Sequence, residues 1–128
     1  MKTTLFPQKQ VQKSGYKKPG QLSANYLTRL FLRWSRSMGY FASLINNVGI
    51  YDAKIGRYRK SQTKQGFPDI VIIGPFGRFY GVEVKVGRDT LSEAQKRCAE
   101  EIKAAGGEYI TARSVEDVYL AITSHCKQ

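Results

Sequence analysis

Residues 66–86 of this 128-residue chain read GFPDIVIIGPFGRFYGVEVKV, and they predict two β-strands joined by a short turn. The stretch 68–74 is a continuous apolar run, which is typical of a buried strand. Pro75 and Gly77 suit turn positions, and 78–86 then reads as a second strand. Because the connection is so short, we expect the two strands to pair as a hairpin.

The second of these strands predicts a polar cluster on one face of the sheet. Side chains alternate between the two faces of a strand. In the stretch 81–86 the valines therefore share one face, whereas Glu83 and Lys85 share the other, about 7 Å apart along the strand. Asp69 opens the preceding strand and can come near Glu83, although the sequence leaves the register open. Charges within an apolar sheet need partners, because burying an unpaired charge costs several kcal/mol.

Two interpretations of these three charged residues stay open on spacing alone. In the first, Lys85 pairs with Glu83 or Asp69, or points to solvent. In the second, the two carboxylates hold a hard divalent cation such as Mg²⁺, which prefers oxygen ligands and substrate phosphate. The lysine would then lie beside the water that the metal activates.

The flanking sequence predicts helices and strands on both sides of this hairpin. Apolar residues recur at helical spacing over 23–38, and 40–45 predicts a short strand. After the hairpin, 92–105 predicts a helix, 109–112 a strand and 114–122 a last helix. The predicted order is therefore helix, three strands, helix, strand, helix, which is an α/β chain.

Positive charge is concentrated in the first half of the chain. The net charge is +11, and residues 1–64 contain thirteen Lys or Arg and one acid, Asp52. Residues 65–128 contain eight Lys or Arg and nine acids. This asymmetry predicts that the first half meets a polyanion. Nucleic acid is favoured over a membrane surface, because the basic residues do not line the back of an apolar amphipathic anchor.

The basic stretch 46–66 predicts a long loop that contacts nucleic acid. Its tyrosines are interleaved with lysines and arginines, a combination that suits phosphate contact and base stacking. A loop of about twenty residues is long for a compact domain, and such loops are usually functional or disordered. The expected nucleic-acid contacts are Asn47, Tyr51, Lys54, Arg57, Tyr58, Arg59, Lys60 and Lys64.

The remaining features indicate how the chain is organised. Residues 1–22 contain five lysines and no periodic pattern, so they predict a flexible basic arm, with 23–128 as the folded domain. Cys98, Cys126 and the single His125 are too few for a four-ligand zinc site. No apolar run approaches the ~18 residues needed to span a bilayer, and the start lacks the apolar region of a signal peptide. We therefore expect an intracellular protein.

Two short motifs, Pro68-Asp69 (PD) and Glu83-Val84-Lys85 (EVK), are separated by one apolar strand and a turn. This combination resembles the core of PD-(D/E)XK nucleases. More narrowly, the chain resembles the VRR-NUC family over about residues 24–122, through NNVGIYDAKIGRYRKS, GFPDIVIIGPFGRFYGVEVKVGRDTLSEAQ and AAGGEYITARSVEDV. An isolated PD or EXK is a weak signal, whereas the whole combination is specific. The resemblance implies a restriction-endonuclease-like α/β fold, with a central mixed β-sheet flanked by helices in the order αβββαβα.

The resemblance also implies the roles of individual residues in a metal-dependent deoxyribonuclease. Asp69 and Glu83 would be ligands of Mg²⁺, for which Mn²⁺ can substitute, and the backbone carbonyl of Val84 would complete the protein's share of the coordination. Lys85 would position and help activate the attacking water, or stabilise charge on the phosphate. No small-molecule cofactor is implied.

Gln95 matches a recurrent family glutamine that lies near the active site. Its other possible role is structural, since Ser92 with Gln95 can form a capping box at the start of the helix, as can Thr90 with Glu93. Both roles stay open.

One departure from the family pattern concerns a glutamate near the start of the first helix. That position falls near Ala24, between Ser23 and Asn25, and no acid precedes Asp52. The departure implies that water or Asn25 replaces the ligand, that metal binding is weaker, or that activity is lost.

The resemblance finally implies a substrate and an assembly. Small stand-alone relatives resemble Holliday-junction resolvases and act as homodimers, and two active sites on a symmetric dimer suit the cutting of two strands of branched DNA. We therefore expect a structure-specific DNA endonuclease in the cytoplasm of a bacterium or a phage-infected host. The alternatives are a non-catalytic nucleic-acid-binding protein on a nuclease fold, and a nuclease acting on flaps, nicks or single strands.

Overall fold

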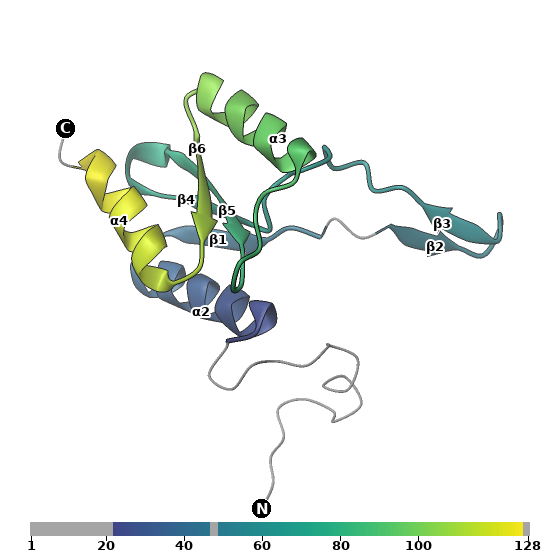
Figure 1. Cartoon of the computed structure of the whole chain (residues 1–128), viewed down its shortest axis with the longest axis horizontal. Helices are drawn as coiled ribbons and strands as arrows, with labels where there is room; N and C mark the ends of the chain where they lie inside the picture. Colours follow the sequence, from purple (N-terminus) through teal and green to yellow (C-terminus); the bar gives the residue numbers. More distant parts are fainter. Residues whose placement is uncertain (1–21, 47–48, 127–128) are drawn as a thin grey trace, which may run out of the picture.

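A computed structural model describes residues 22–46 and 49–126 of the chain, which form a central sheet with helices around it and a separate ribbon (Figure 1). In chain order the elements are α2 (Ala24–Ser37), β1 (Phe41–Leu44), β2 (Ile50–Asp52), β3 (Arg57–Arg59), β4 (Ile70–Ile73), the 3₁₀ turn η1 (Pro75–Gly77), β5 (Phe79–Val84), α3 (Glu93–Ala104), β6 (Glu108–Ala112) and α4 (Val115–Cys126). No helix among these residues is long and apolar enough to cross a membrane.

The central sheet has four strands in the order β1-β4-β5-β6. β4 pairs antiparallel with β1 and with β5, whereas β5 and β6 run parallel, so the sheet is mixed. The predicted hairpin of β4 and β5 is confirmed, with Ile70 opposite Val82 and Ile73 opposite Phe79. The α/β fold and the αβββαβα order of the core are likewise confirmed.

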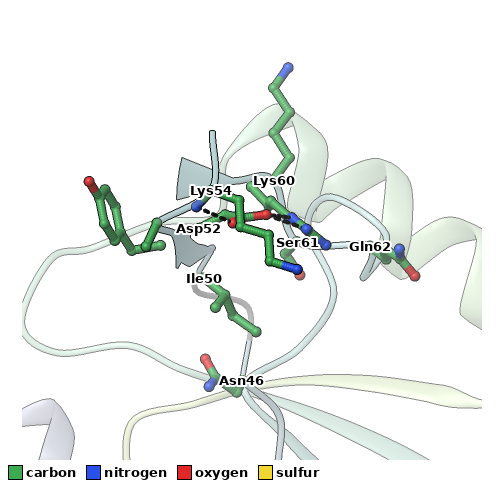
Figure 2. A pocket seen from close by; sticks show the side chains of 10 residues that line it. Asn46, Ile50, Asp52, Lys54, Lys60, Ser61 and Gln62 are labelled. Atoms are coloured by element: carbon green, nitrogen blue, oxygen red, sulfur yellow. Dashed lines mark hydrogen bonds and ion pairs between the residues drawn. The ribbon is translucent and has the colours of Figure 1, made fainter. Parts of the chain in front are cut away.

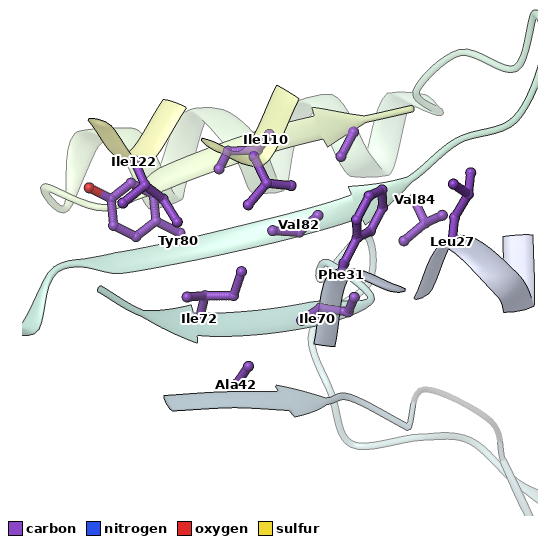
Figure 3. Close-up of a cluster of buried hydrophobic side chains, with 12 residues drawn as sticks. Leu27, Phe31, Ala42, Ile70, Ile72, Tyr80, Val82, Val84, Ile110 and Ile122 are labelled. Carbon is purple, nitrogen blue, oxygen red and sulfur yellow. The ribbon is translucent and has the colours of Figure 1, made fainter. Parts of the chain in front are cut away.

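The hydrophobic core lies between one face of the sheet and helices α2 and α4 (Figure 3). Its buried side chains come from both helices and all four strands: Leu27, Phe31, Ala42, Ile70, Ile72, Tyr80, Val82, Val84, Ile110, Ala112, Val118 and Ile122. Val82 and Val84 point into this core, so strand alternation directs Glu83 to the opposite face, where α3 packs. The apolar and polar faces predicted for β5 are both present.

The long loop expected over 46–66 is wrong in part, because this stretch contains an antiparallel ribbon, β2–β3. The Asp52 side chain organises its turn by accepting a hydrogen bond from the Lys54 backbone at 2.9 Å, and the Asp52 carbonyl accepts one from Gly56 at 2.9 Å. Gly56 has a φ of +67°, which suits glycine in such a turn. Figure 1 shows the ribbon well away from the central sheet.

Two of the predicted features lie partly outside the described residues. The basic arm predicted over 1–22 falls there except for Leu22, and so does Asn47.

Candidate active site

The loop before β4 is fixed in place by two glycines that allow close packing. A Cβ atom on Gly81 would lie 2.5 Å from Cγ of Pro68, so glycine lets the buried Pro68 ring rest on β5. Gly66 has a φ of +83°, and a Cβ there would lie 2.3 Å from the Ala94 carbonyl oxygen. Asp69 directly follows Pro68, so these contacts with β5 and α3 determine where its carboxylate lies.

The Asp69 carboxylate is held against β5. Its Oδ2 accepts a hydrogen bond from the Val84 backbone N–H at 2.9 Å. Since Ile70 pairs with Val82 in the antiparallel ladder, Asp69 lies one step further along, beside Glu83. The structure therefore brings the two acids together, as the strand pattern suggested.

Glu83 is a buried carboxylate with one oxygen left over. Only 5% of the residue is exposed, and its Oε1 accepts a hydrogen bond from Gln95 Nε2 at 2.6 Å. Oε2 is buried and has no hydrogen-bond partner among the described residues. Burial, followed by the nearby charge of Asp69, raises the pKa of Glu83 from 4.5 to about 7. Such an orphaned acceptor is rare in folded proteins and calls for a ligand or another explanation.

Lys85 shares this face of β5. Its Nζ lies 3.7 Å from Oε1 of Glu83, and its side chain is 15% exposed. The ion pair of the first interpretation is therefore present. It involves the oxygen that Gln95 already contacts, so it leaves Oε2 of Glu83 without a partner.

Gln95 combines the two roles that the sequence left open. Its Oε1 accepts a hydrogen bond from the Ser92 backbone at 2.9 Å, which completes the capping box at the start of α3. Its Nε2 donates to Glu83 at the same time. Ser92 with Gln95, rather than Thr90 with Glu93, thus forms the box. One side chain fixes the start of α3 and orients the buried carboxylate.

A cleft of about 450 Å³ opens beside Asp69, between α2, the end of β1 and the end of β5. Its lining consists of Ala24, Asn25, Thr28, Arg29, Leu32, Leu44, Asp69 and Val84. The position of the missing acid near Ala24 thus faces this cleft. No group of three or more His, Cys, Asp or Glu that could hold a metal occurs among the described residues. Any metal here would rely on two carboxylates and backbone or amide oxygens.

Sequence reasoning missed three residues around the site. Thr28 and Arg29 line the cleft one turn after Ala24, and their spacing from that position on a helix could have indicated it. Tyr109 is buried on β6, and its hydroxyl donates to the Gly66 carbonyl at 3.3 Å. Burial and the charge of Glu83 raise the Tyr109 pKa, so this hydroxyl stays protonated and can support the loop before Asp69.

The residues predicted to contact nucleic acid lie mainly on the ribbon. The ribbon, with its turn and the residue that follows β3, contains Tyr51, Lys54, Arg57, Tyr58, Arg59 and Lys60. It lies away from the central sheet that carries Asp69 and Glu83 (Figure 1). Arg59 forms an ion pair with Asp52. Lys64 pairs with Glu101 of α3, and this hydrogen bond raises the Lys64 pKa.

Two comparisons with known proteins agree with this arrangement. The family profile of the VRR-NUC domain matches residues 21–116. A solved structure titled "VRR_NUC domain" is similar with a TM-score of 0.52 and 20% sequence identity, over 77% of this chain and 92% of that chain. At this identity the structural match supports the fold alone. No curated protein matches the sequence.

Proposed function

Because the chain belongs to the VRR-NUC domain family, a family of PD-(D/E)XK nucleases, we propose that it is a Mg²⁺-dependent DNA endonuclease. The observation that carries the proposal is the buried Glu83 carboxylate, whose Oε2 has no partner among the described residues and which lies beside Asp69. An unpartnered buried acceptor is costly, and a cation would satisfy it.

The donor set fits a hard divalent cation. Asp69, Glu83 and the carbonyl of Val84 would hold it, and Mg²⁺ commonly binds through one or two carboxylates together with substrate phosphate. When bound, such a metal polarises a phosphate and lowers the pKa of its water. Mn²⁺ is expected to substitute, because it also accepts carboxylate and water ligands.

The chain's own residues then have separate tasks. Lys85 would position the attacking water or stabilise charge on the phosphate through its Nζ. Gln95 is a positioning residue, because its hydrogen bond engages Oε1 of Glu83 and leaves Oε2 for a ligand. The Asp69 carboxylate accepts the Val84 N–H through Oδ2, and as a carboxylate with two oxygens it can also serve as a ligand.

The substrate we propose is branched DNA, cut by a homodimer in the cytoplasm. Support comes from the basic first half of the chain, which carries thirteen Lys or Arg against one acid in residues 1–64. Basic side chains neutralise phosphates and give sequence-independent affinity. The mass in solution, measured by size-exclusion chromatography with light scattering, tests the dimer separately.

The decisive experiment is a cleavage assay on four-way junction, flap, duplex and single-stranded DNA, with Mg²⁺, Mn²⁺ or EDTA. Asp69→Ala and Lys85→Ala should bind the substrate and fail to cut it. Lys96→Ala is the matched control, because Lys96 is an exposed lysine of α3 whose ion pair is with Glu93. Equal cleavage by wild type and both site variants would overturn the site.

A second candidate is a non-catalytic nucleic-acid-binding protein on the same fold. It is favoured by one observation: among the described residues that line the cleft, Asp69 is the single acid, and Ala24 and Asn25 occupy the positions near the start of α2. DNA binding by the wild type without cleavage of any substrate, in either metal, would support it over the endonuclease.

A further inference from the structure

The β2–β3 ribbon presents two different faces. Tyr51 and Tyr58 lie directly opposite each other, with ring centroids 5.2 Å apart and an interplanar angle of 66°. They are 56% and 70% exposed, although large aromatic side chains are normally covered. The neighbouring pairs, Ile50 with Arg59 and Asp52 with Arg57, place their side chains on the other face by strand alternation.

A basic cavity lies beside the ribbon and the connections that lead to it. This cavity of about 800 Å³ is lined by Ile50, Tyr51, Asp52, Ala53, Lys54 and Arg59 of the ribbon, and by Asn46, Lys60, Ser61 and Gln62 next to it (Figure 2). The cavity is lined by three cationic side chains, those of Lys54, Arg59 and Lys60. The Asp52 carboxylate forms an ion pair with Arg59 and so neutralises one of these charges. This chemistry suits a sugar-phosphate backbone.

The β2–β3 ribbon is expected to bind a partner, and the positive charge of the ribbon indicates the chemical class of that partner. An isolated two-stranded hairpin is marginally stable in water, and this one forms a sheet of its own. Residues 49–64 carry five Lys or Arg and one acid, so two copies of the ribbon would repel each other. A polyanion is complementary to this surface, and among polyanions nucleic acid alone offers flat rings for the tyrosines.

We propose that the Tyr51–Tyr58 face stacks on base surfaces that are exposed at a branch or break in DNA, while Lys54, Arg57 and Lys60 contact the adjacent backbone. In a continuous duplex, every base surface is covered by its neighbour, so the tyrosines gain nothing there. At a junction, flap or end they can stack, and the ribbon thereby gives preference for branched DNA. This inference rests on the proposed function, because it assigns the substrate class of the same nuclease.

The test measures binding in EDTA, with no metal and no cleavage, to a four-way junction and to a linear duplex whose two ends are each closed by a non-nucleotide linker, so that the duplex contains no unpaired base. Base–aromatic stacking predicts that Tyr58→Thr loses roughly 5- to 100-fold in junction affinity and less than about 2-fold in duplex affinity. Threonine keeps the β-propensity of the strand. Tyr58→Phe is the matched control and should retain junction affinity, because it keeps the ring.

A charge variant and a spectroscopic signal separate stacking from backbone contact. The double variant Arg57→Gln with Lys60→Gln should weaken binding to both DNAs. The slope of the logarithm of the binding constant against the logarithm of the salt concentration should fall by the amount expected for the loss of about two phosphate contacts. A 2-aminopurine base at the branch should change its fluorescence on addition of wild type and Tyr58→Phe, and much less with Tyr58→Thr.

Three outcomes would overturn the inference. The first is an equal loss of affinity for both DNAs in Tyr58→Thr, and the second is no loss of affinity for either DNA. The third is a lower mass of Tyr58→Thr in solution with unchanged junction affinity, which would identify the ribbon as a self-association arm. The nuclease proposal is judged separately by Asp69-dependent cleavage. A protein that cuts DNA and fails the ribbon test keeps its function and loses only this mode of recognition.

Discussion

Replacing Glu83 by glutamine should stabilise the metal-free protein above neutral pH. The buried Glu83 carboxyl has its pKa raised from 4.5 to about 7, first by burial and then by the charge of Asp69. Between these values the folded state binds a proton that the unfolded state has released, so stability falls as the pH rises from 4.5 to 7. At about 1.4 kcal/mol per pKa unit, the loss amounts to roughly 3 kcal/mol at pH 8 and above.

Glutamine has almost the same shape and carries no charge to bury. It can still accept the hydrogen bond from Gln95, whereas its ion pair with Lys85 is lost. The partly buried Lys85 then lacks the carboxylate with which it pairs, which offsets part of the gain. We therefore expect Glu83→Gln to be more stable than wild type by about 1–2 kcal/mol at pH 8.5 and no more stable at pH 4.5.

The assay is urea unfolding in EDTA at the two pH values, with Glu93→Gln as the control. Glu93 is exposed on α3, so its variant should match wild type at both pH values. Addition of Mg²⁺ should stabilise wild type in proportion to its binding and leave Glu83→Gln nearly unchanged. The reasoning is refuted if Glu83→Gln is destabilised at pH 8.5 as much as at pH 4.5, since burial of the charge would then carry no penalty.

Three further tests concern the arrangement around this carboxylate. Gln95→Ala should lower both stability and the rate of cleavage, while Ser92→Ala, which removes the same capping box, should cost about 1 kcal/mol in urea unfolding and leave cleavage intact. Ala24→Glu should tighten Mn²⁺ binding in calorimetric titration, because it adds an acid to the cleft at a helix N-terminus, and Ala24→Gln should not. Gly81→Ala should cost about 1–3 kcal/mol by forcing Pro68 off β5, and cleavage should fall with it as Asp69 shifts.

The central sheet could be predicted from the sequence because strands that pack against a core have a recognisable pattern of apolar residues. β4 is apolar throughout, and from the end of β5 onward valines alternate with Glu83 and Lys85, as one core face and one polar face require. The ribbon could not be predicted in this way. Its strands are three residues long and largely exposed, so no core imposes an apolar period on them. The strands are instead marked by paired tyrosines and by the Asp52 turn.

The candidate site was predictable as a set of residues but not as a geometry. Strand alternation grouped Glu83 with Lys85, whereas the approach of Asp69 depends on the register of β4 and β5. That register is determined by the turn between them, in which Phe76 and Gly77 both have positive φ angles of 62° and 72°. The hydrogen bond from Val84 to Asp69 follows from this register. Short-range sequence patterns do not determine this register, so they cannot predict the hydrogen bond either.

The role of Gln95 illustrates why the structural and functional interpretations of a residue need not compete. A capping glutamine uses its carbonyl oxygen, and its amide nitrogen is then free to point toward β5, where it contacts Glu83. Helix α3 is thereby attached to the sheet through the same carboxylate that would bind the metal. If Glu83 served only stability, a neutral side chain would serve better above pH 7. A buried acid whose second oxygen has no partner among the described residues therefore supports the proposed ligand, and the stability of Glu83→Gln measures the free energy that the buried charge costs the fold.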